Sequence, residues 1–391
     1  MLRPSNSYLS TACDETRSMM KKKDSPEWIF AFVLMTAFAI GISAQDTLKD
    51  AFKDSFLIGA SLNRAQIIEE DKLGANIVKT QFNTISPENT LKWESVHPQP
   101  DRYDFDLADR YVAFGEKHGM FTIGHTLVWH NQTPEWVFKD RKGNLVNRDE
   151  LLKRLRAHIQ TVVGRYKGKI RGWDVVNEAL NEDGTLRQSL WLQIIGKDFI
   201  DKAFQFAHEA DPNAELYYND YSLENAAKLK GAVELVKHLQ SAKITIKAVG
   251  LQGHYNLSFP TLVQLDNAIS AFAKLGIKVN ITELDVSVLP DPEGFTGAEV
   301  TLNFAMKEKL DPYRTGLPDT MQRTLASRYS DLFGIFLKHR KDMDRVTFWN
   351  VTDGDSWLNN FPIRGRTNYP LLFDRKGKTK PAYNAVIQTV K

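Results

Sequence analysis

The sequence predicts an α/β fold, a single-domain (β/α)₈ TIM barrel preceded by an N-terminal signal segment. From residue 45 to residue 391, short apolar runs typical of strands alternate with longer helical patterns, and there are eight such runs. No Pro/Ser linker, low-complexity tract or repeat divides this stretch. Eight strands alternating with helices favour a closed parallel barrel. The alternative, a doubly wound open sheet, usually has a Gly-rich turn after its first strand, and Gly59-Ala60-Ser61-Leu62 lacks that pattern.

The predicted strands and helices follow one another along the chain. The eight predicted strands are Phe56–Leu62, Ile77–Phe82, Phe121–Trp129, Ile170–Glu178, Ala214–Asn219, Ile244–Tyr255, Ile277–Glu283 and Arg345–Val351. Apolar residues from Leu151 to Val163 recur at helical spacing, as do those from Phe199 to Ala207. The second of these helices is expected to stop at Asp211-Pro212, because proline cannot continue a helix. Long loops are predicted at Leu289–Asp319 and Leu358–Pro370.

Residues 1–44 are predicted to be an N-terminal extension with a secretory signal peptide, and residues 45–391 the folded domain. Lys21-Lys22-Lys23 precedes an apolar run from Trp28 to Ile42, and the small residues Ser43-Ala44 follow it. The run is short for a membrane span, which needs about 20 residues. An uncleaved anchor is the alternative. Cleavage after Ala44 predicts a secreted or periplasmic protein with no stable membrane partner.

The composition excludes several classes of protein. The net charge is +3, from 51 basic and 48 acidic side chains, so nucleic acid is not a predicted partner. The only cysteine, Cys13, precedes the apolar run. Cleavage after Ala44 would therefore exclude disulfides, thiol nucleophiles and Cys-ligated metals. No metal-binding pattern is evident, so we expect no metal and no cofactor. We also expect a monomer.

Polar residues stand at the ends of most predicted strands. The C-terminal ends of the strands form the face on which TIM-barrel enzymes place their catalytic groups. These polar residues include His125, Trp129-His130, Asn177-Glu178, Asn219-Asp220-Tyr221, Gln252-Gly253-His254, Glu283-Leu284-Asp285, Trp349 and Asp353. Their repetition at most of the strand ends indicates a polar ring around one cleft.

Two glutamates in this ring suggest the chemistry. Glu178 ends the fourth predicted strand and Glu283 the seventh, so their side chains can face each other across the barrel. Cleavage of a glycosidic bond needs two carboxyl groups that flank the bond. For either glutamate alone, a solvated loop acid is the simpler explanation. Together, each at the end of an apolar strand, they favour a catalytic pair.

The chain resembles glycoside hydrolase family 10, the xylanase family, over nearly all of Phe56–Tyr383. The matching motifs are Glu88–Trp93, Gly124–His130, Asp174–Ala179, Tyr217–Tyr221, Gly250–His254, Ile281–Asp285, Phe348-Trp349, Ser356-Trp357 and Pro370–Asp374. One such motif would be weak support, but this ordered set is specific. Asn350 departs from the pattern, because glycine is frequent after the tryptophan of this motif.

The resemblance implies that Glu178 is the acid/base and Glu283 the nucleophile of a retaining mechanism with a covalent glycosyl-enzyme intermediate. The two carboxyl groups are then expected about 5 to 5.5 Å apart. A neighbouring Glu283 carboxylate should raise the pKa of Glu178 by repulsion, which suits an acid that must be protonated near neutral pH.

The resemblance also implies substrate-binding roles. The residues concerned are Glu88, Asn89, Lys92, His125, Trp129, Asn177, Tyr221, Gln252, His254, Trp349 and Trp357. Glu88 and Lys92 are expected on one face of a helical turn. Asn177 would bind the 2-hydroxyl of the sugar at the cleavage point. Trp349 and Trp357 would form a cage over the sugars upstream of the cut, too tight for the hydroxymethyl group of glucose.

His254 and Asp285 are expected behind the nucleophile. A histidine held by an aspartate can donate its other N–H to Glu283 and keep that carboxylate ionised. A core histidine without a catalytic tie is the alternative.

The function that follows is an endo-1,4-β-xylanase acting on xylan and xylooligosaccharides. A retaining β-1,4-glucanase, or a mixed xylanase and glucanase, is the alternative with the same mechanism. A non-catalytic glycan-binding protein on the same barrel is the other, and it would bind without releasing reducing sugar.

Overall fold

The computed structural model describes residues 47–295 and 297–391, so the predicted N-terminal extension and signal peptide at residues 1–44 lie outside the described residues. Within the described part, no helix is both long enough and apolar enough to cross a membrane. The strands are β1 Leu57–Leu62, β2 Thr84–Pro87, β3 Phe121–Val128, β4 Gly172–Asn177, β5 Glu215–Asp220, β6 Ala248–Leu251, β7 His254–Asn256, β8 Lys278–Ser287 and β9 Met343–Phe348.

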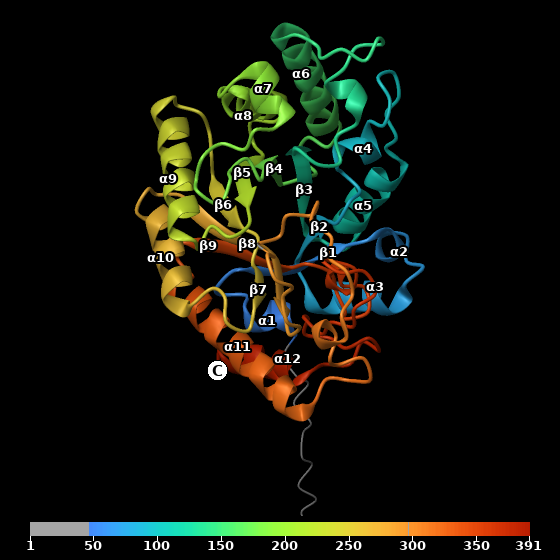
Figure 1. Ribbon diagram of the computed structural model, residues 1–391, viewed down its shortest axis with the longest axis vertical. Helices are drawn as coiled ribbons and strands as arrows, with labels where there is room; N and C mark the ends of the chain where they lie inside the picture. The colour runs from blue at the N-terminus through green and yellow to red at the C-terminus, as the bar shows by residue number, and fades with distance from the viewer. Residues whose placement is uncertain (1–46, 296) are drawn as a thin grey trace, which may run out of the picture. The chain divides into compact units, whose positions relative to one another are not determined.

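Helices lie between most of these strands and around them (Figure 1). They are α1 Leu48–Ala51, α2 Arg64–Ile67, α3 Lys72–Gln81, α4 Trp93–Val96, α5 Asp106–Lys117, α6 Arg148–Arg165, α7 Leu190–Ile195, α8 Phe199–Ala210, α9 Ala226–Ser241, α10 Leu262–Ala273, α11 Asp319–Lys338 and α12 Pro381–Gln388. Short 3₁₀ turns lie at Glu135–Val137, Glu308–Leu310 and Trp357–Asn359.

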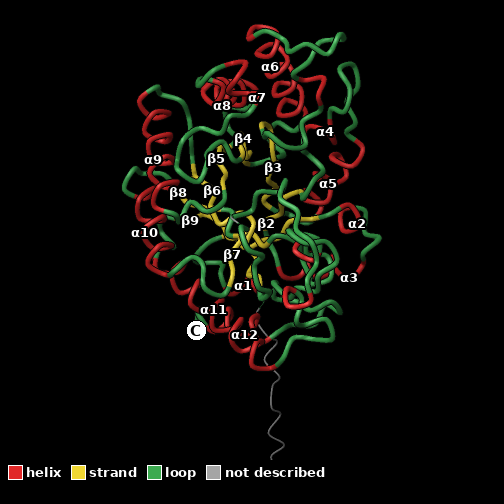
Figure 2. Tube along the Cα trace, viewed as in Figure 1, coloured by secondary structure: helices red, strands yellow, loops and turns green. Residues whose placement is uncertain are grey.

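The strands form a closed parallel barrel, as the sequence predicts. Neighbours pair in the order β6-β5-β4-β3-β2-β1-β9-β8, and β6 also pairs with β8, which closes the ring. The short strand β7 pairs only with the end of β8, at His254 and Asp285, and lies outside the ring. Figure 2 shows the strands at the centre with helices around them. Parallel pairing brings the C-terminal ends of all eight ring strands to one face.

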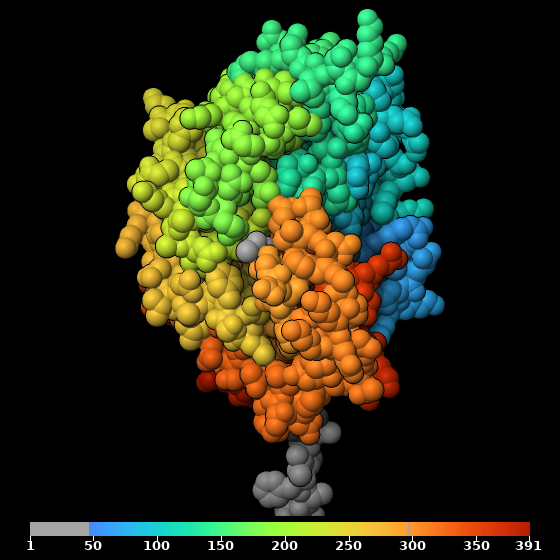
Figure 3. Space-filling model, viewed as in Figure 1, coloured from blue at the N-terminus to red at the C-terminus, as the bar shows by residue number. Residues whose placement is uncertain are grey.

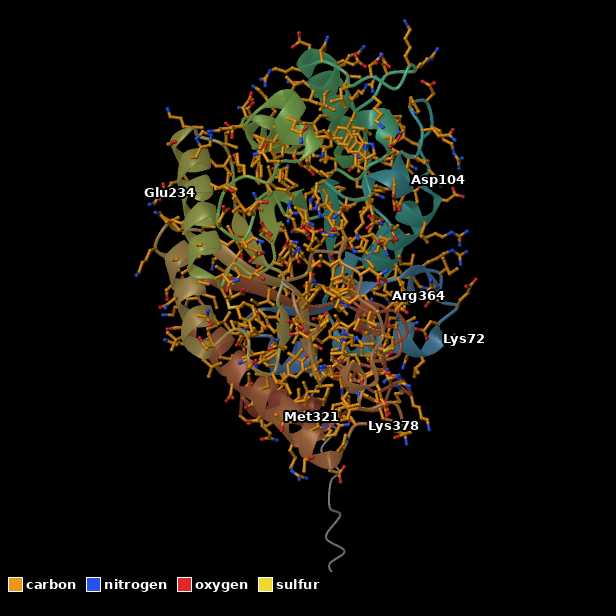
Figure 4. All side chains as sticks on the ribbon, in the orientation of Figure 1. Lys72, Asp104, Glu234, Met321, Arg364 and Lys378 are labelled. Atoms are coloured by element: carbon orange, nitrogen blue, oxygen red, sulfur yellow. The ribbon has the colours of Figure 1, made fainter. Side chains whose placement is uncertain are left out.

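The helices bury one face and expose charge on the other. In α6, Leu151, Leu155 and Ile159 are buried, and Asn147 caps the first turn by accepting from the Glu150 N–H at 2.9 Å. α8 ends before Asp211, as predicted. Figure 4 shows the exposed side chains of Lys72 and Glu234 on the outer surface. This distribution is typical of helices that pack around a buried barrel.

The prediction of a strand at Ile77–Phe82 is wrong. Residues 77–81 belong to α3, which Asp71 caps through the Gly74 N–H, and Ile77 and Val78 lie on its buried face with Ala75. The second strand is β2, with Ile85 as its only large apolar side chain. A short apolar run fits a buried helix face as well as a strand, and here the cap decides in favour of the helix.

Two further boundaries differ from the prediction. Residues 88–92 form a turn rather than a helix, because α4 begins at Trp93 and Lys92 is its N-cap. The run Ile244–Tyr255 contains two strands, β6 and β7, separated at Gly253, whose φ of +84° favours glycine. The loops after β8 and after Trp357 are long, as predicted.

Gly124 on β3 makes room for a large core side chain. A Cβ at this position would lie 2.1 Å from Cε3 of Trp173, whose side chain is completely buried on β4. A methyl group there must displace either the indole ring or β3. His125 is the next residue of β3, so a displaced strand would also move His125.

We expect Gly124→Ala to lower the free energy of unfolding by about 1–3 kcal/mol, because it overpacks the barrel wall. Gly164→Ala is the matched control, since Gly164 lies exposed in α6 with open space around its Cα. This control should raise the free energy of unfolding by about 0.5–1 kcal/mol. Urea unfolding of both variants measures the difference, and equal effects of the two substitutions would contradict the packing argument.

Candidate active site

A cavity of about 180 Å³ opens at the C-terminal face of the barrel. It is lined by Glu88, Asn89, Lys92, His125, Trp129, Gln132, Glu178, Gln252, His254, Glu283, Ala298, Val300, Trp349 and Trp357. These residues come from the ends of β2, β3, β4, β6, β8 and β9 and from the segments that follow them. Most of the residues that the sequence predicts for the site therefore lie together in one cavity, including both glutamates.

Glu178 directly follows β4 and has a φ of +56°, which turns its side chain from the strand direction toward the cavity. Its carboxylate accepts hydrogen bonds from Trp129 Nε1 at 2.7 Å, from Gln252 Nε2 at 2.9 Å and from Asn177 Nδ2 at 3.0 Å. These donors hold both carboxylate oxygens in place. The orientation of Glu178 is thus determined by the neighbouring strand ends.

Burial raises the pKa of Glu178 to about 7, and the negative charges of Asp220 and Glu283 add to the effect. The hydrogen bonds from Gln252 and Trp129 act in the opposite direction but do not outweigh burial. The Glu178 side chain therefore carries a proton over much of the range in which an ordinary glutamate is ionised.

Glu283 lies in β8 and faces the same cavity. Asn219 Nδ2 donates to its Oε1 at 2.8 Å, and His254 Nε2 lies 3.2 Å from its Oε2. Burial alone raises the pKa of Glu283, but the hydrogen bond from His254 and the charges of His125 and His254 outweigh burial and lower it below the usual value. The two glutamates of one cavity thus have pKa values displaced in opposite directions.

A short chain of amides connects the two glutamates. Asn219 Nδ2 also donates to Asn177 Oδ1 at 2.8 Å, and Asn177 donates to Glu178. Asn177 is buried and does not line the cavity of the glutamates, so its predicted contact with a sugar hydroxyl stays a prediction. Hydrogen bonds thus connect the carboxylates of Glu178 and Glu283 through the ends of β4 and β5.

His254 stands between two carboxylates. Its Nδ1 lies 3.0 Å from Asp285 Oδ2, while its Nε2 contacts Glu283, which is the arrangement that the sequence suggests. Burial alone lowers the pKa of His254, but Asp285 and Glu283 outweigh it and raise the pKa to about 10. The ring is therefore a cation that donates from both nitrogens. Trp357 Nε1 donates to the same Asp285 oxygen at 2.7 Å.

The opposite wall of the cavity is built around a buried lysine. Lys92 Nζ donates to Asn89 Oδ1 and to Gln132 Oε1, both at 2.9 Å, and lies 4.8 Å from the centre of the Trp129 ring. Burial lowers the pKa of Lys92, while the charges of Glu283, Glu88 and Glu178 oppose that shift. These side chains present a dense set of donors and acceptors suited to sugar hydroxyls.

Aromatic rings close the remaining sides. Trp349 contacts the His125 ring edge-on at 5.5 Å, and Trp357 lies over His254 with the ring centres 4.7 Å apart. His125 Nδ1 is held by Asp174 Oδ2 at 3.0 Å. Both tryptophans line the cavity, and Trp357 also lines a second cavity of about 380 Å³ together with His254 and Ala298.

Tyr221, another predicted site residue, lies near enough to Glu178 for that carboxylate to raise its pKa, after the larger effect of burial. It is buried and lines neither cavity. Gly297, in the loop after β8, lies against its ring, and Arg187 Nη2 donates to its hydroxyl at 2.9 Å. Arg187 also pairs with Glu299 of the same loop at 2.5 Å. Figure 3 shows this loop, in orange, beside the green residues that follow β4.

Asn350 adopts the backbone geometry for which glycine is the usual residue. Its φ is +79°, a region that L-residues seldom occupy, although asparagine enters it more readily than most. The backbone at position 350 therefore has a conformation that glycine, the frequent residue of the family motif, would also adopt. Asparagine differs from glycine there only by its side chain.

Four residues of the site were not among the predicted site residues. Ala298 and Val300, in the loop after β8, line the cavity and carry no polar signal in the sequence. Gln132 lines the cavity beside Lys92, and Asn219, named above only as part of the polar ring, donates to Glu283. Both belong to polar clusters at strand ends: Gln132 follows Trp129-His130, and Asn219 ends β5. Their position at those ends was the available signal. Among the described residues, no group of three or more His, Cys, Asp or Glu side chains could hold a metal ion.

Comparisons with known proteins agree with this geometry. A family model described as Glycosyl hydrolase family 10 matches residues 47–389. Endo-1,4-beta-xylanase A from Xylanibacter ruminicola is 47% identical over 344 residues, which cover 88% of this chain and 93% of that protein. Beta-1,4-xylanase from Dictyoglomus thermophilum is 40% identical over 369 residues, or 92% of this chain and 97% of that protein.

Solved structures give the same result. A family 10 endoxylanase retrieved from a sugarcane soil metagenome has a TM-score of 0.85 and 45% sequence identity to this chain. The alignment covers 87% of this chain and 99% of that structure.

The pKa of Glu178 gives a prediction about stability. Because burial raises the folded-state pKa to about 7, from the ordinary value of 4.5, the folded chain binds more protons between these values and loses stability as the pH rises through them. Glu178→Gln cannot ionise. We therefore expect its stability relative to the unsubstituted chain to rise between about pH 4 and about pH 8.

Urea unfolding at both pH values measures this change. Glu234→Gln, at an exposed site on α9, is the control and should show no such increase. The same pH dependence in both variants would mean that Glu178 does not titrate at a raised pKa.

Proposed function

The chain belongs to glycosyl hydrolase family 10, and on this premise we propose that it is an endo-1,4-β-xylanase in which Glu178 is the acid/base and Glu283 the nucleophile. The observation that carries the proposal is the opposite displacement of two pKa values in one cavity. A retaining glycosidase needs one protonated and one ionised carboxyl group at the same bond, and this site supplies both.

In the first step, the ionised Glu283 attacks the anomeric carbon. The bond from that carbon to the leaving oxygen breaks, and its electron pair takes the proton of Glu178. The product is a glycosyl ester on Glu283 and a shortened chain with a free hydroxyl group. Protonated His254 keeps Glu283 ionised before the attack, because its positively charged ring donates a hydrogen bond to the Glu283 carboxylate and stabilises the ionised form.

In the second step, Glu178 acts as a base. Once Glu283 is an ester, its charge no longer raises the pKa of Glu178, which is then ionised more readily. Glu178 takes a proton from water, and the water oxygen attacks the anomeric carbon and releases Glu283. Two displacements at one carbon restore the original configuration.

The shape of the cavity supports xylan as the substrate. Trp349, Trp357 and Val300 line the same cavity as Glu88 and Lys92. Xylose lacks the hydroxymethyl group of glucose, and closely placed aromatic rings admit the smaller sugar and clash with the larger one. A second cavity of about 380 Å³, which shares His254, Ala298 and Trp357 with the first, offers space for further sugars of the chain.

Early products of xylan hydrolysis, followed by proton NMR, should carry the β configuration at the new reducing end. Carboxymethyl cellulose should be hydrolysed far more slowly than xylan. Glu283→Ala should remain folded and release no reducing sugar, because it lacks the attacking oxygen. Products that first appear as the α anomer would exclude a retaining mechanism, and activity on cellulose alone would exclude the proposed substrate.

Glu178→Ala should affect substrates according to their leaving groups. Hydrolysis of xylan needs protonation of the leaving oxygen, so kcat/KM should fall about 10²–10⁴-fold. An aryl xylobioside with an acidic phenol as leaving group needs little protonation and should lose much less in the first step. An equal loss on both substrates would show that Glu178 does not serve as the acid.

A further inference from the structure

Asn350 is strained where glycine would not be. It lies two residues after the end of β9, is almost completely buried and has a φ of +79°. A side chain in this region is less favourable than in ordinary backbone geometry, although asparagine tolerates it better than most residues. Its contacts must offset this cost.

The contacts of Asn350 connect the barrel to Trp357. The Asn350 N–H donates to Ser61 Oγ on β1 at 2.7 Å, which holds the residue against the barrel. Its side-chain Oδ1 accepts from the backbone N–H of Trp357 at 3.0 Å. Trp357 begins a 3₁₀ turn, so its N–H has no partner within that turn, and the asparagine side chain supplies one.

Trp357 is held at its other end as well. Its indole Nε1 donates to Asp285, and its ring lines both cavities. The Asn350 bond and the Asp285 bond thus anchor the backbone and the ring tip of the same residue. The Asn350 amide also lies near enough to Glu88 to lower the pKa of that carboxyl, against the larger effect of burial.

We propose that Asn350 is a positioning residue that holds Trp357 over the sugars upstream of the cut and so increases the affinity of this side of the site. The proposal rests on the proposed xylanase function. Glycine fits the backbone at position 350 but has no side chain to accept from Trp357. Asparagine at position 350 therefore strains the backbone, but its side chain fixes the position of Trp357.

Asn350→Gly tests this exchange on the full chain with an aryl β-xylobioside, which places both sugars upstream of the cut. The substitution relieves strain and removes one hydrogen bond of Trp357. We expect an unchanged or higher thermal midpoint together with a KM raised about two- to tenfold. The kcat should stay within about twofold, because Asn350 does not line the cavity of the two glutamates.

Two further variants complete the experiment. Lys243→Gly relieves a comparable positive φ of +55° at an exposed position beyond α9, and it should leave KM unchanged. Asn350→Ala also removes the acceptor oxygen but leaves the position beside Glu88 uncharged, so it should raise KM as Asn350→Gly does. If Asn350→Gly is not recovered folded, Asn350→Ala decides alone: a KM raised more than about twofold supports the proposal, and an unchanged KM overturns it.

An unchanged KM in folded Asn350→Gly overturns the proposal, since the Asn350 side chain would then contribute nothing to the affinity for the sugars upstream of the cut. A fall in kcat with unchanged KM also overturns it, because that result places Asn350 in the chemical step. An unsubstituted chain that does not cleave the xylobioside contradicts the proposed function itself, so the two failures are distinguishable.

Discussion

His254 carries the positive charge on which the ionisation of this site depends. It is enclosed by Asp285 and Glu283, and these two carboxylates raise its pKa against the opposing effect of burial. Its charge in turn lowers the pKa of Glu283, whereas Glu178, with amide and indole donors only, has its pKa raised by burial. Two chemically identical side chains are thereby assigned different protonation states by their surroundings. Trp357 belongs to the same network, because its indole shares the Asp285 oxygen that holds His254.

The closed barrel is what brings these groups together. Glu178 and Glu283 are far apart in the sequence, directly after β4 and on β8, and only parallel pairing around a ring brings both to one face. Asn219 on β5, between them, binds both Glu283 and Asn177. The loop after β8 then reaches back across this face to Arg187 through Glu299, and it covers Tyr221. The Tyr221 side of this face is therefore in contact with a loop that sequence periodicity does not describe.

The sequence predicts the barrel and most of the site because both depend on local patterns at strand ends. Apolar runs followed by polar residues mark β3, β4, β5, β6 and β8, and the motifs at those ends carry the family resemblance. The second strand was misplaced because Ile77 and Val78 form an apolar run on the buried face of α3, whereas β2 has little apolar character of its own. The burial of Tyr221 depends on a contact with Gly297 that only the folded loop creates. The asparagine at position 350 does not by itself indicate a positive φ. Only the frequency of glycine at this position of the family motif suggests one.

The proposed roles of Glu178 and Glu283 require unequal protonation of the two side chains, and a direct titration of their carboxyl carbons tests this. Carbon-13 NMR of the chain with labelled glutamate side chains, assigned through Glu178→Gln and Glu283→Gln, measures both pKa values in the resting enzyme. We expect a pKa of about 7 for Glu178 and a value below that of an ordinary glutamate for Glu283. The reverse order, or two ordinary values, would contradict the assignment of acid and nucleophile.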